Sequence, residues 1–166
     1  MQYVLKINKA LQETGKIIGG ISIVLMMTII VLDVFLRNFF ATPIPGSYAI
    51  IENYLMPIAI FPVLGYVYME NILPKLGEFV SKKSKQFQKI NNIILLFMDT
   101  IVFILLTYYS FIYFLGMSSK GMEIQIATKF VPIWPVYFVV PLGFFLVFLE
   151  VILRLIQEIK KKAISS

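Results

Sequence analysis

The chain has 166 residues, of which 59% are hydrophobic and only 14% are charged, and its net charge is +6. A soluble domain usually has about 25% charged residues, so this composition is typical of an integral membrane protein. The sequence contains no cysteine and no histidine, which excludes disulfide bonds, thiol and imidazole catalysis, and the commonest metal ligands.

Four hydrophobic segments follow one another along the chain. Each is long enough to cross about 30 Å of hydrocarbon as a helix. We predict membrane spans over residues 17–36, 48–69, 93–116 and 133–156. Their apolar runs are continuous rather than alternating, which favours helices over a β-barrel. The first run is too long for a signal peptide, so we expect an uncleaved span and one all-α integral membrane domain over residues 1–166.

Two segments outside these spans carry lysines between apolar residues at helical spacing, namely residues 1–14 and 72–90. Both predict amphipathic helices that lie in the membrane surface with their lysines toward lipid phosphates. The alternative for each segment is a solvated basic linker.

The basic residues are distributed unevenly between the two sides of a four-span arrangement. Twelve of the fifteen lie before the first span, between the second and third spans, or in the C-terminal segment that begins with Arg154 at the end of the fourth span. The loops 37–47 and 117–132 hold the other three. By the positive-inside rule, both termini and the middle loop are predicted to be cytoplasmic.

Charged residues near or inside the spans are costly, so each needs a reason. Asp33 and Arg37 are four residues apart and predict an ion pair on one helix face, although Arg37 could instead meet a partner protein or a lipid headgroup. Glu52 lies one turn into the second span. The dipole of that helix favours an acid there, and the alternative is a contact with Arg37 or another subunit.

Four further charged or aromatic residues stand out in the second half of the chain. Asp99 has no partner within reach in the sequence, so we expect a buried contact for it. Glu150 and Arg154 predict a second ion pair at four-residue spacing. Trp134 predicts an aromatic anchor at the membrane interface. The candidate partner-interface residues are therefore Asp33, Arg37, Glu52, Asp99 and Trp134.

Small residues and prolines predict how the spans pack. Gly15 and Gly19 are four residues apart and can bring two helices close together. Pro57 and Pro62 lie inside the second span and predict a bend there.

The sequence shows no phosphate-binding loop, metal cluster or activated nucleophile, and no span has the broken polar centre of an ion-coupled transporter site. The residues therefore predict a membrane scaffold or accessory subunit without a catalytic, cofactor or metal site. Two alternatives stay open: a small four-helix membrane enzyme that conjugates lipophilic substrates, and a stand-alone exporter that uses Glu52 or Asp99 as a proton relay.

Two stretches resemble a known family. The first contains Arg37, then Pro43-Ile44-Pro45-Gly46-Ser47, then Glu52 and Leu64-Gly65; the second joins Val131-Pro132-Ile133-Trp134 to Pro141-Leu142-Gly143. In this order they are similar to the small (Q, DctQ-like) membrane subunit of the tripartite ATP-independent periplasmic (TRAP) transporters. Many members carry a histidine-containing basic stretch after the second span, where this chain has Met69-Glu70-Asn71.

The resemblance implies a bacterial inner-membrane complex. A large (M) subunit would carry the substrate and sodium sites and move as an elevator, so no cofactor is expected on this chain. A periplasmic binding protein would deliver an organic acid anion, either sialic acid (the SiaQ-like type) or a C4-dicarboxylate. The loops 37–47 and 117–132 would be available to that binding protein.

Overall fold

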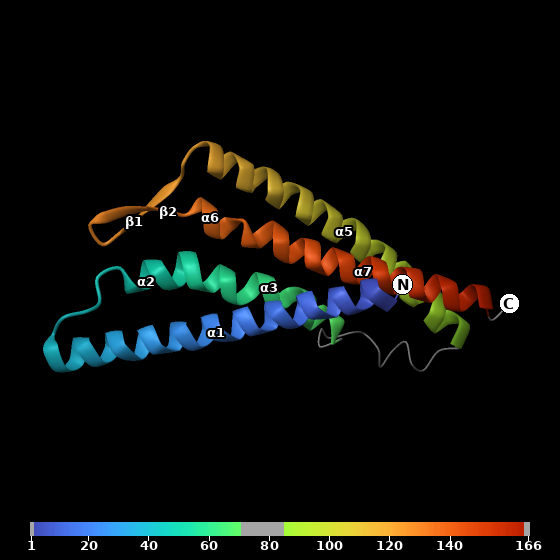
Figure 1. The fold of residues 1–166 in the computed structure, drawn as a ribbon, viewed down its shortest axis with the longest axis horizontal. Helices are drawn as coiled ribbons and strands as arrows, with labels where there is room; N and C mark the ends of the chain where they lie inside the picture. The colour runs from blue at the N-terminus through green and yellow to red at the C-terminus, as the bar shows by residue number, and fades with distance from the viewer. Residues whose placement is uncertain (1, 71–84, 165–166) are drawn as a thin grey trace.

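The computed structural model describes residues 2–70 and 85–164. In these ranges four helices are long and apolar enough to cross a membrane, namely Lys6–Phe40, Ser47–Met69, Ile90–Ser119 and Trp134–Ile159. They cover the four predicted spans except for Ile133, which precedes the fourth helix, and they extend beyond most of the predicted ends. The prediction of four membrane-spanning helices is therefore confirmed (Figure 1).

Two of the helices are much longer than a membrane is thick. Helix α1 runs from Gln2 to Phe40 and α5 from Lys85 to Ser119. With 39 residues α1 is about 58 Å long, nearly twice the hydrocarbon thickness. Residues 2–14, which we predicted as a separate surface helix, are instead the first turns of α1.

The second predicted surface helix is only partly described. Its residues 85–90 are the first turns of α5, again continuous with the span. Its residues 72–84 lie outside the described part of the chain.

The second span combines three helical pieces that meet just before Pro57, whereas Pro62 lies inside the third piece. Helix α2 (Ser47–Ile50) leads into a π-helical turn over Ile51–Leu55 and then into α3 (Met56–Met69). The amide of Met56 bonds to the carbonyl of Ile51, five residues back, just before Pro57, which has no amide hydrogen to donate. The hydroxyl of Ser22 on α1 donates to the carbonyl oxygen of Leu55 at 2.8 Å and so binds this turn to the first span.

The loop before the fourth span forms a small antiparallel hairpin that we did not predict. Strand β1 (Glu123–Ile126) pairs with β2 (Lys129–Pro132), and Ile126 lies opposite Lys129. The chain then continues through α6 (Trp134–Tyr137) into α7 (Val139–Ile164).

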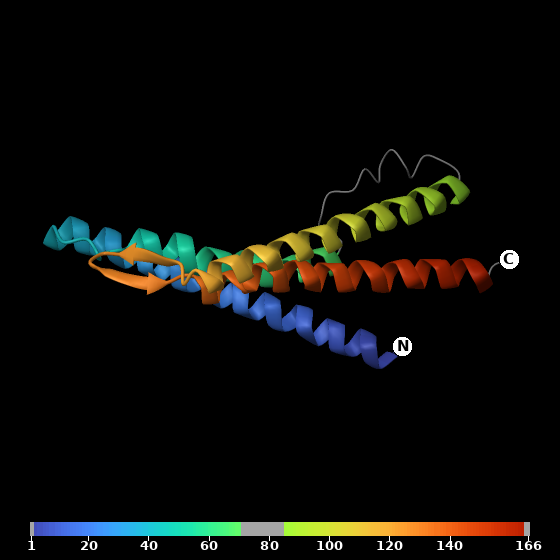
Figure 2. The same cartoon turned by 90° about the horizontal axis from the view of Figure 1, so that it is seen from above.

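The long helices pack in the order α1, α3, α7, α5, which differs from their order in the chain. In Figure 1 the α1–α3 pair and the α5–α7 pair diverge toward the hairpin and come together at the opposite end, where both termini lie. Seen from above in Figure 2, the first turns of α1 and of α5 leave the layer on opposite sides of α7.

Small residues allow the closest helix contacts. A Cβ atom on Gly15 would overlap the carbonyl oxygen of Pro62, and one on Gly19 would overlap Val63 and the carbonyl of Ala59. The predicted glycine pair therefore does bring two helices together, and its partner is α3. Gly143 of α7 meets the backbone of Phe61 in the same way, so α3 is closely packed on both sides.

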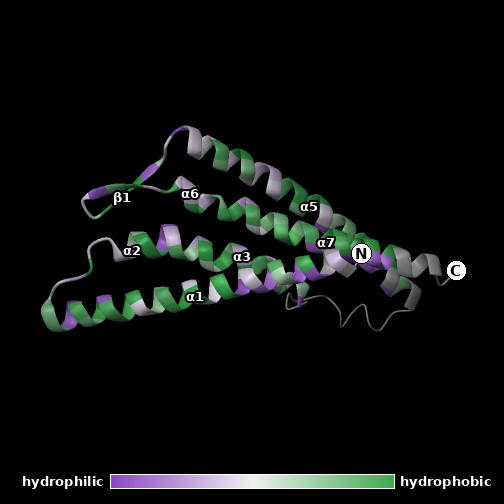
Figure 3. Cartoon of the chain, in the orientation of Figure 1, coloured by the Kyte–Doolittle hydropathy of each residue, from purple (hydrophilic) through white to green (hydrophobic). Residues whose placement is uncertain are grey.

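Hydrophobic residues predominate along the spans (Figure 3), and many of their large side chains are exposed. The buried cluster of Leu96, Val147 and Val151 lies between α5 and α7, with Tyr68 and Phe103 packed against it. Most large apolar side chains of α1 and α5 are exposed, as expected for helices whose surroundings are lipid or another membrane subunit.

Candidate functional site: a polar network across the four helices

Buried polar side chains of α1 and α7 bind each other. Asn8 donates from Nδ2 to the carboxylate of Glu150 at 2.6 Å, although the two residues are 142 positions apart in the chain. Gln12 is fully buried and donates from Nε2 to the carbonyl oxygen of Leu146 at 3.1 Å. These contacts satisfy groups that would be costly to leave unpaired in an apolar interior.

Gly65 on α3 leaves room for the amide of Gln12. A Cβ atom at this position would overlap the side chain of Gln12. Among the described residues, the buried Oε1 atom of Gln12 has no hydrogen-bond donor, so this amide is held through its nitrogen. Packing therefore explains why a small residue, Gly65, stands late in the second span.

Arg154 connects α7 to the end of α3. Its Nε lies 2.7 Å from Glu150 Oε1, which confirms the predicted ion pair. Its Nη2 donates to the carbonyl oxygen of Met69 in the last turn of α3, and its guanidinium lies 5.3 Å from the centre of the Tyr68 ring. A cation is favourable at this place, because the last carbonyls of a helix lack intrahelical partners and carry partial negative charge.

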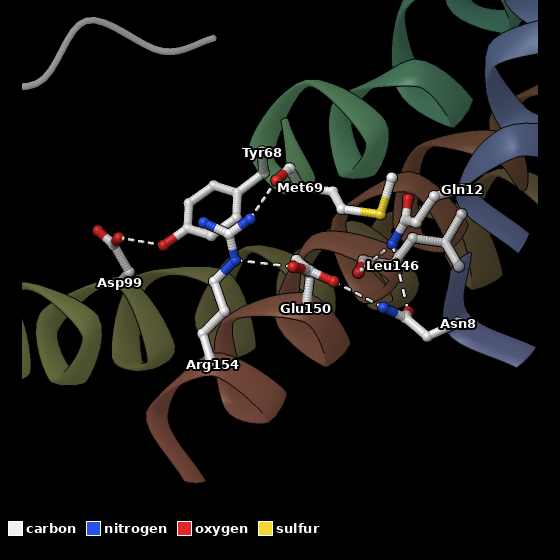
Figure 4. A network of polar contacts seen from close by, with 8 residues as sticks. All are labelled: Asn8, Gln12, Tyr68, Met69, Asp99, Leu146, Glu150 and Arg154. Carbon is white, nitrogen blue, oxygen red and sulfur yellow. Dashed lines mark hydrogen bonds and ion pairs between the residues drawn. The ribbon is translucent and has the colours of Figure 1, made fainter. Parts of the chain in front are cut away.

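Tyr68 extends the network to the fourth helix. Its hydroxyl donates to Asp99 Oδ2 of α5 at 2.6 Å, and its ring packs edge-on against Phe103 at 6.0 Å between ring centres. The partner of Asp99 is thus a tyrosine of the second span, 31 residues away, and the contact is only partly buried, whereas we expected a buried one. Figure 4 shows the whole path from Asn8 through Glu150, Arg154 and Tyr68 to Asp99.

These contacts join all four spans at the end of the bundle where the termini lie. We refer to the side chains that make them as the polar network: Asn8, Gln12, Tyr68, Asp99, Glu150 and Arg154. A cavity of about 270 Å³ opens beside it between α5 and α7, and Asn92 and Gln157 are among its lining residues. The arrangement holds helices together; its acids are engaged by Asn8, Arg154 and Tyr68.

A second polar cluster orders the loop after the first span. Asp33 accepts hydrogen bonds from Arg37 Nη2 at 2.6 Å, from the amide of Ile44 at 2.7 Å and from the hydroxyl of Ser47 at 3.2 Å. The predicted Asp33–Arg37 pair is present. Asp33 is buried, whereas the Arg37 side chain is 64% exposed at the edge of the cluster.

The two loops at this end also contact each other. The hydroxyl of Tyr54 donates to the carbonyl oxygen of Pro132 at 2.8 Å. Gly46, at a φ of 78°, lies so close to Ile126 of the hairpin that a Cβ atom would overlap it. The loop 41–46 and the hairpin therefore form one surface.

Two of the candidate residues are not part of either cluster. Glu52 is exposed on the π-helical turn and forms no ion pair with Arg37 or with any other described residue. Trp134 is half-buried at the first residue of α6, at the same end of the bundle as the hairpin. Sequence reasoning also missed Asn8 and Gln12, which lie four residues apart on α1 and could have been recognised as a polar pair on an otherwise apolar face.

The fold and these clusters define a multi-pass helical membrane protein whose internal polar groups hold its helices together. Over residues 26–161 the chain matches the family described as the DctQ component of the tripartite ATP-independent periplasmic transporters. It belongs to this family and is a small membrane subunit of a TRAP transporter. The curated proteins gave no match to the sequence. Asn8 and Gln12 lie before the matched residues, so the α1 part of the polar network lies outside them.

Proposed function

We propose that this chain is the fixed accessory subunit of a sodium-coupled TRAP transporter in a bacterial inner membrane. It packs against a large membrane subunit, which binds the sodium ions and the substrate and moves during transport. The substrate is an organic acid anion, with sialic acid and C4-dicarboxylates as the two candidate classes. Both termini of the small subunit lie in the cytoplasm.

The observation that supports this role is the polar network. A fixed part of a transporter must resist separation and tilting of its helices while a neighbouring part moves. Here polar side chains from all four spans bond to one another, and removal of any one leaves a partner unsatisfied in an apolar environment. Such an arrangement suits a rigid structural support, because the polar groups are engaged in contacts between helices.

The joined surface of the loop 41–46 and the hairpin supports a second part of the proposal. It lies at the end of the bundle opposite the termini and so faces the periplasm in the proposed orientation. It presents exposed Phe130 and Lys129 on the hairpin and Arg37 beside the loop. We infer that the periplasmic binding protein touches this surface when it docks on the complex.

Reconstitution of uptake tests the accessory role. We expect liposomes that contain both membrane subunits to accumulate a labelled substrate when the binding protein is outside and the sodium concentration is higher outside than inside. Liposomes with this chain alone are expected to show no uptake above empty liposomes. The chain should also co-purify with the large subunit in detergent. Substrate uptake by this chain alone, or its failure to associate with the large subunit, would overturn the proposal.

A further inference from the structure

Asp99 is a charged group in the first third of the third span. It lies nine residues after the start of the span Ile90–Ser119, which corresponds to about 13 Å along the helix. Within the described part of the chain its one hydrogen-bond donor is Tyr68. An ionised carboxylate has two oxygens and about four acceptor positions, so a single neutral donor leaves most of its capacity unused among apolar neighbours.

Asp99 itself lies in a row of exposed apolar residues on α5. Leu95, Asp99, Val102 and Leu106 are separated by four, three and four residues, so they follow one face of the helix. The three apolar members are 50%, 50% and 39% exposed. We refer to these four residues as the Asp99 stripe. Alternation of three- and four-residue steps is the spacing at which a second helix packs along a first.

The opposite face of α5 differs in one respect. Phe97, Ile101, Ile104 and Tyr108 are also large and exposed, but no charged residue lies among them. Such a face suits lipid tails. A carboxylate does not, because lipid tails offer it no donor. A polar residue at one position of an apolar helix seam also fixes which partner binds and in which register.

We propose that the Asp99 stripe is a contact surface for a transmembrane helix of the large subunit, and that this helix brings a basic side chain to Asp99. The inference rests on the proposed function, since it needs the large subunit as a partner. The carboxylate is then shared. Tyr68 holds one oxygen from inside the small subunit, and the cation of the partner approaches from the exposed side. Charge-assisted bonds of this kind are stronger than those between neutral groups.

Two conservative variants separate this role from a structural role of Asp99. Asp99→Asn keeps an oxygen that accepts from Tyr68 but removes the charge, whereas Tyr68→Phe removes the internal bond and keeps the charge. In the complete two-subunit complex, we expect Asp99→Asn to raise the dissociation constant about ten-fold or more, as for the loss of one member of an interfacial charge pair. We expect Tyr68→Phe to have the smaller effect on association and the larger effect on the melting temperature of the small subunit alone.

Photo-crosslinking locates the partner helix. A photoreactive amino acid at Val102, in the stripe, is expected to form a crosslink to a peptide of the large subunit that contains or adjoins a lysine or arginine. The same group at Ile104, two residues away and on the opposite face of α5, serves as the matched control and is expected to react with lipid.

Failure of the inference and failure of the proposed function give different results. If the wild-type chain does not associate with the large subunit, the proposed function is wrong. If the wild-type complex forms and Asp99→Asn binds as tightly, then Asp99 is neutral or engaged elsewhere, and the inference is wrong. Crosslinks from Val102 to lipid alone would overturn it as well.

Discussion

At the scale of single residues, the distribution of partners explains which polar side chains can lie inside this bundle. Glu150 accepts a hydrogen bond from Asn8 on one carboxylate oxygen and from Arg154 on the other, and Arg154 also binds the end of α3. Each group thus neutralises or satisfies the next. The stability of such a set depends on all of its members, because loss of one leaves a buried group without its partner.

Replacement of Glu150 tests this dependence. Glu150→Leu removes the carboxylate to which both Asn8 and Arg154 donate, so we expect the free energy of unfolding to fall by about 3–5 kcal/mol. Glu13 is a matched control on α1, since its side chain is 53% exposed and its pair with Lys9 is longer, at 3.8 Å. Glu13→Gln should change stability by less than about 1 kcal/mol. Denaturation of the chain in mixed micelles measures both values, and equal effects of the two variants would contradict the importance of the network.

The sequence could predict one kind of polar contact and not the other. Asp33 with Arg37 and Glu150 with Arg154 are four residues apart on one helix, and this spacing alone brings them together. The contact of Asn8 with Glu150 depends on how the first and fourth spans are placed, which no local spacing determines. The partner of Asp99 was unpredictable for the same reason.

At the scale of elements, α3 is the helix around which the others are arranged. It packs against α1 on one side and α7 on the other, and glycines of both neighbours approach its backbone. Helices in lipid gain little from the hydrophobic effect when they associate, so close contact of backbones supplies much of the attraction. The spacing of Gly15 and Gly19 predicted a close contact of this kind, but it could not identify the partner helix.

A larger side chain at the α1–α3 contact should separate the two helices. Gly19→Val places its Cβ onto Val63 and the carbonyl of Ala59, so we expect a loss of about 1–3 kcal/mol of stability, as for other overpacked sites. Gly20 is the next residue, and a Cβ atom there would meet no neighbouring side chain or helix within 4 Å, so Gly20→Val should be neutral or slightly stabilising. Thermal unfolding followed by circular dichroism compares the two. A Gly20→Val variant as unstable as Gly19→Val would show that the loss does not come from the contact with α3.

The elements themselves were predictable to different degrees. The four spans follow from hydropathy, because each is far longer and more apolar than any loop. The hairpin was missed because its turn lacks the usual Asn-Gly or Asp-Gly signature and instead places Ala127 at a φ of 53°. The ends of α1 and α5 were also missed, since lysines end a hydrophobic run without ending a helix.

At the scale of the whole molecule, the distribution of charge and the arrangement of the helices support the same orientation in the membrane. An even number of spans places both termini at one end of the bundle. By sequence, twelve of the fifteen basic residues belong to the N-terminal segment, the connection between the second and third spans, and the C-terminal segment. The polar network lies toward the same end, while the loop 41–46 and the hairpin occupy the other. In the proposed orientation the polar network therefore lies toward the cytoplasm. The loop 41–46 and the hairpin face the periplasm, and contacts of Tyr54 and Gly46 with the hairpin hold this surface together.

The natural absence of cysteine makes this orientation directly measurable. Thr128→Cys places a single thiol in the exposed hairpin turn, and Tyr3→Cys places one at an exposed position near the start of α1. Because the basic flanks stay on the cytoplasmic side, a membrane-impermeant maleimide should label the thiol at 128 in intact spheroplasts. The thiol at position 3 should react only after the membrane is permeabilised, which also serves as the control for its reactivity. Labelling in the reverse order would place the termini outside and remove the hairpin from reach of any periplasmic protein.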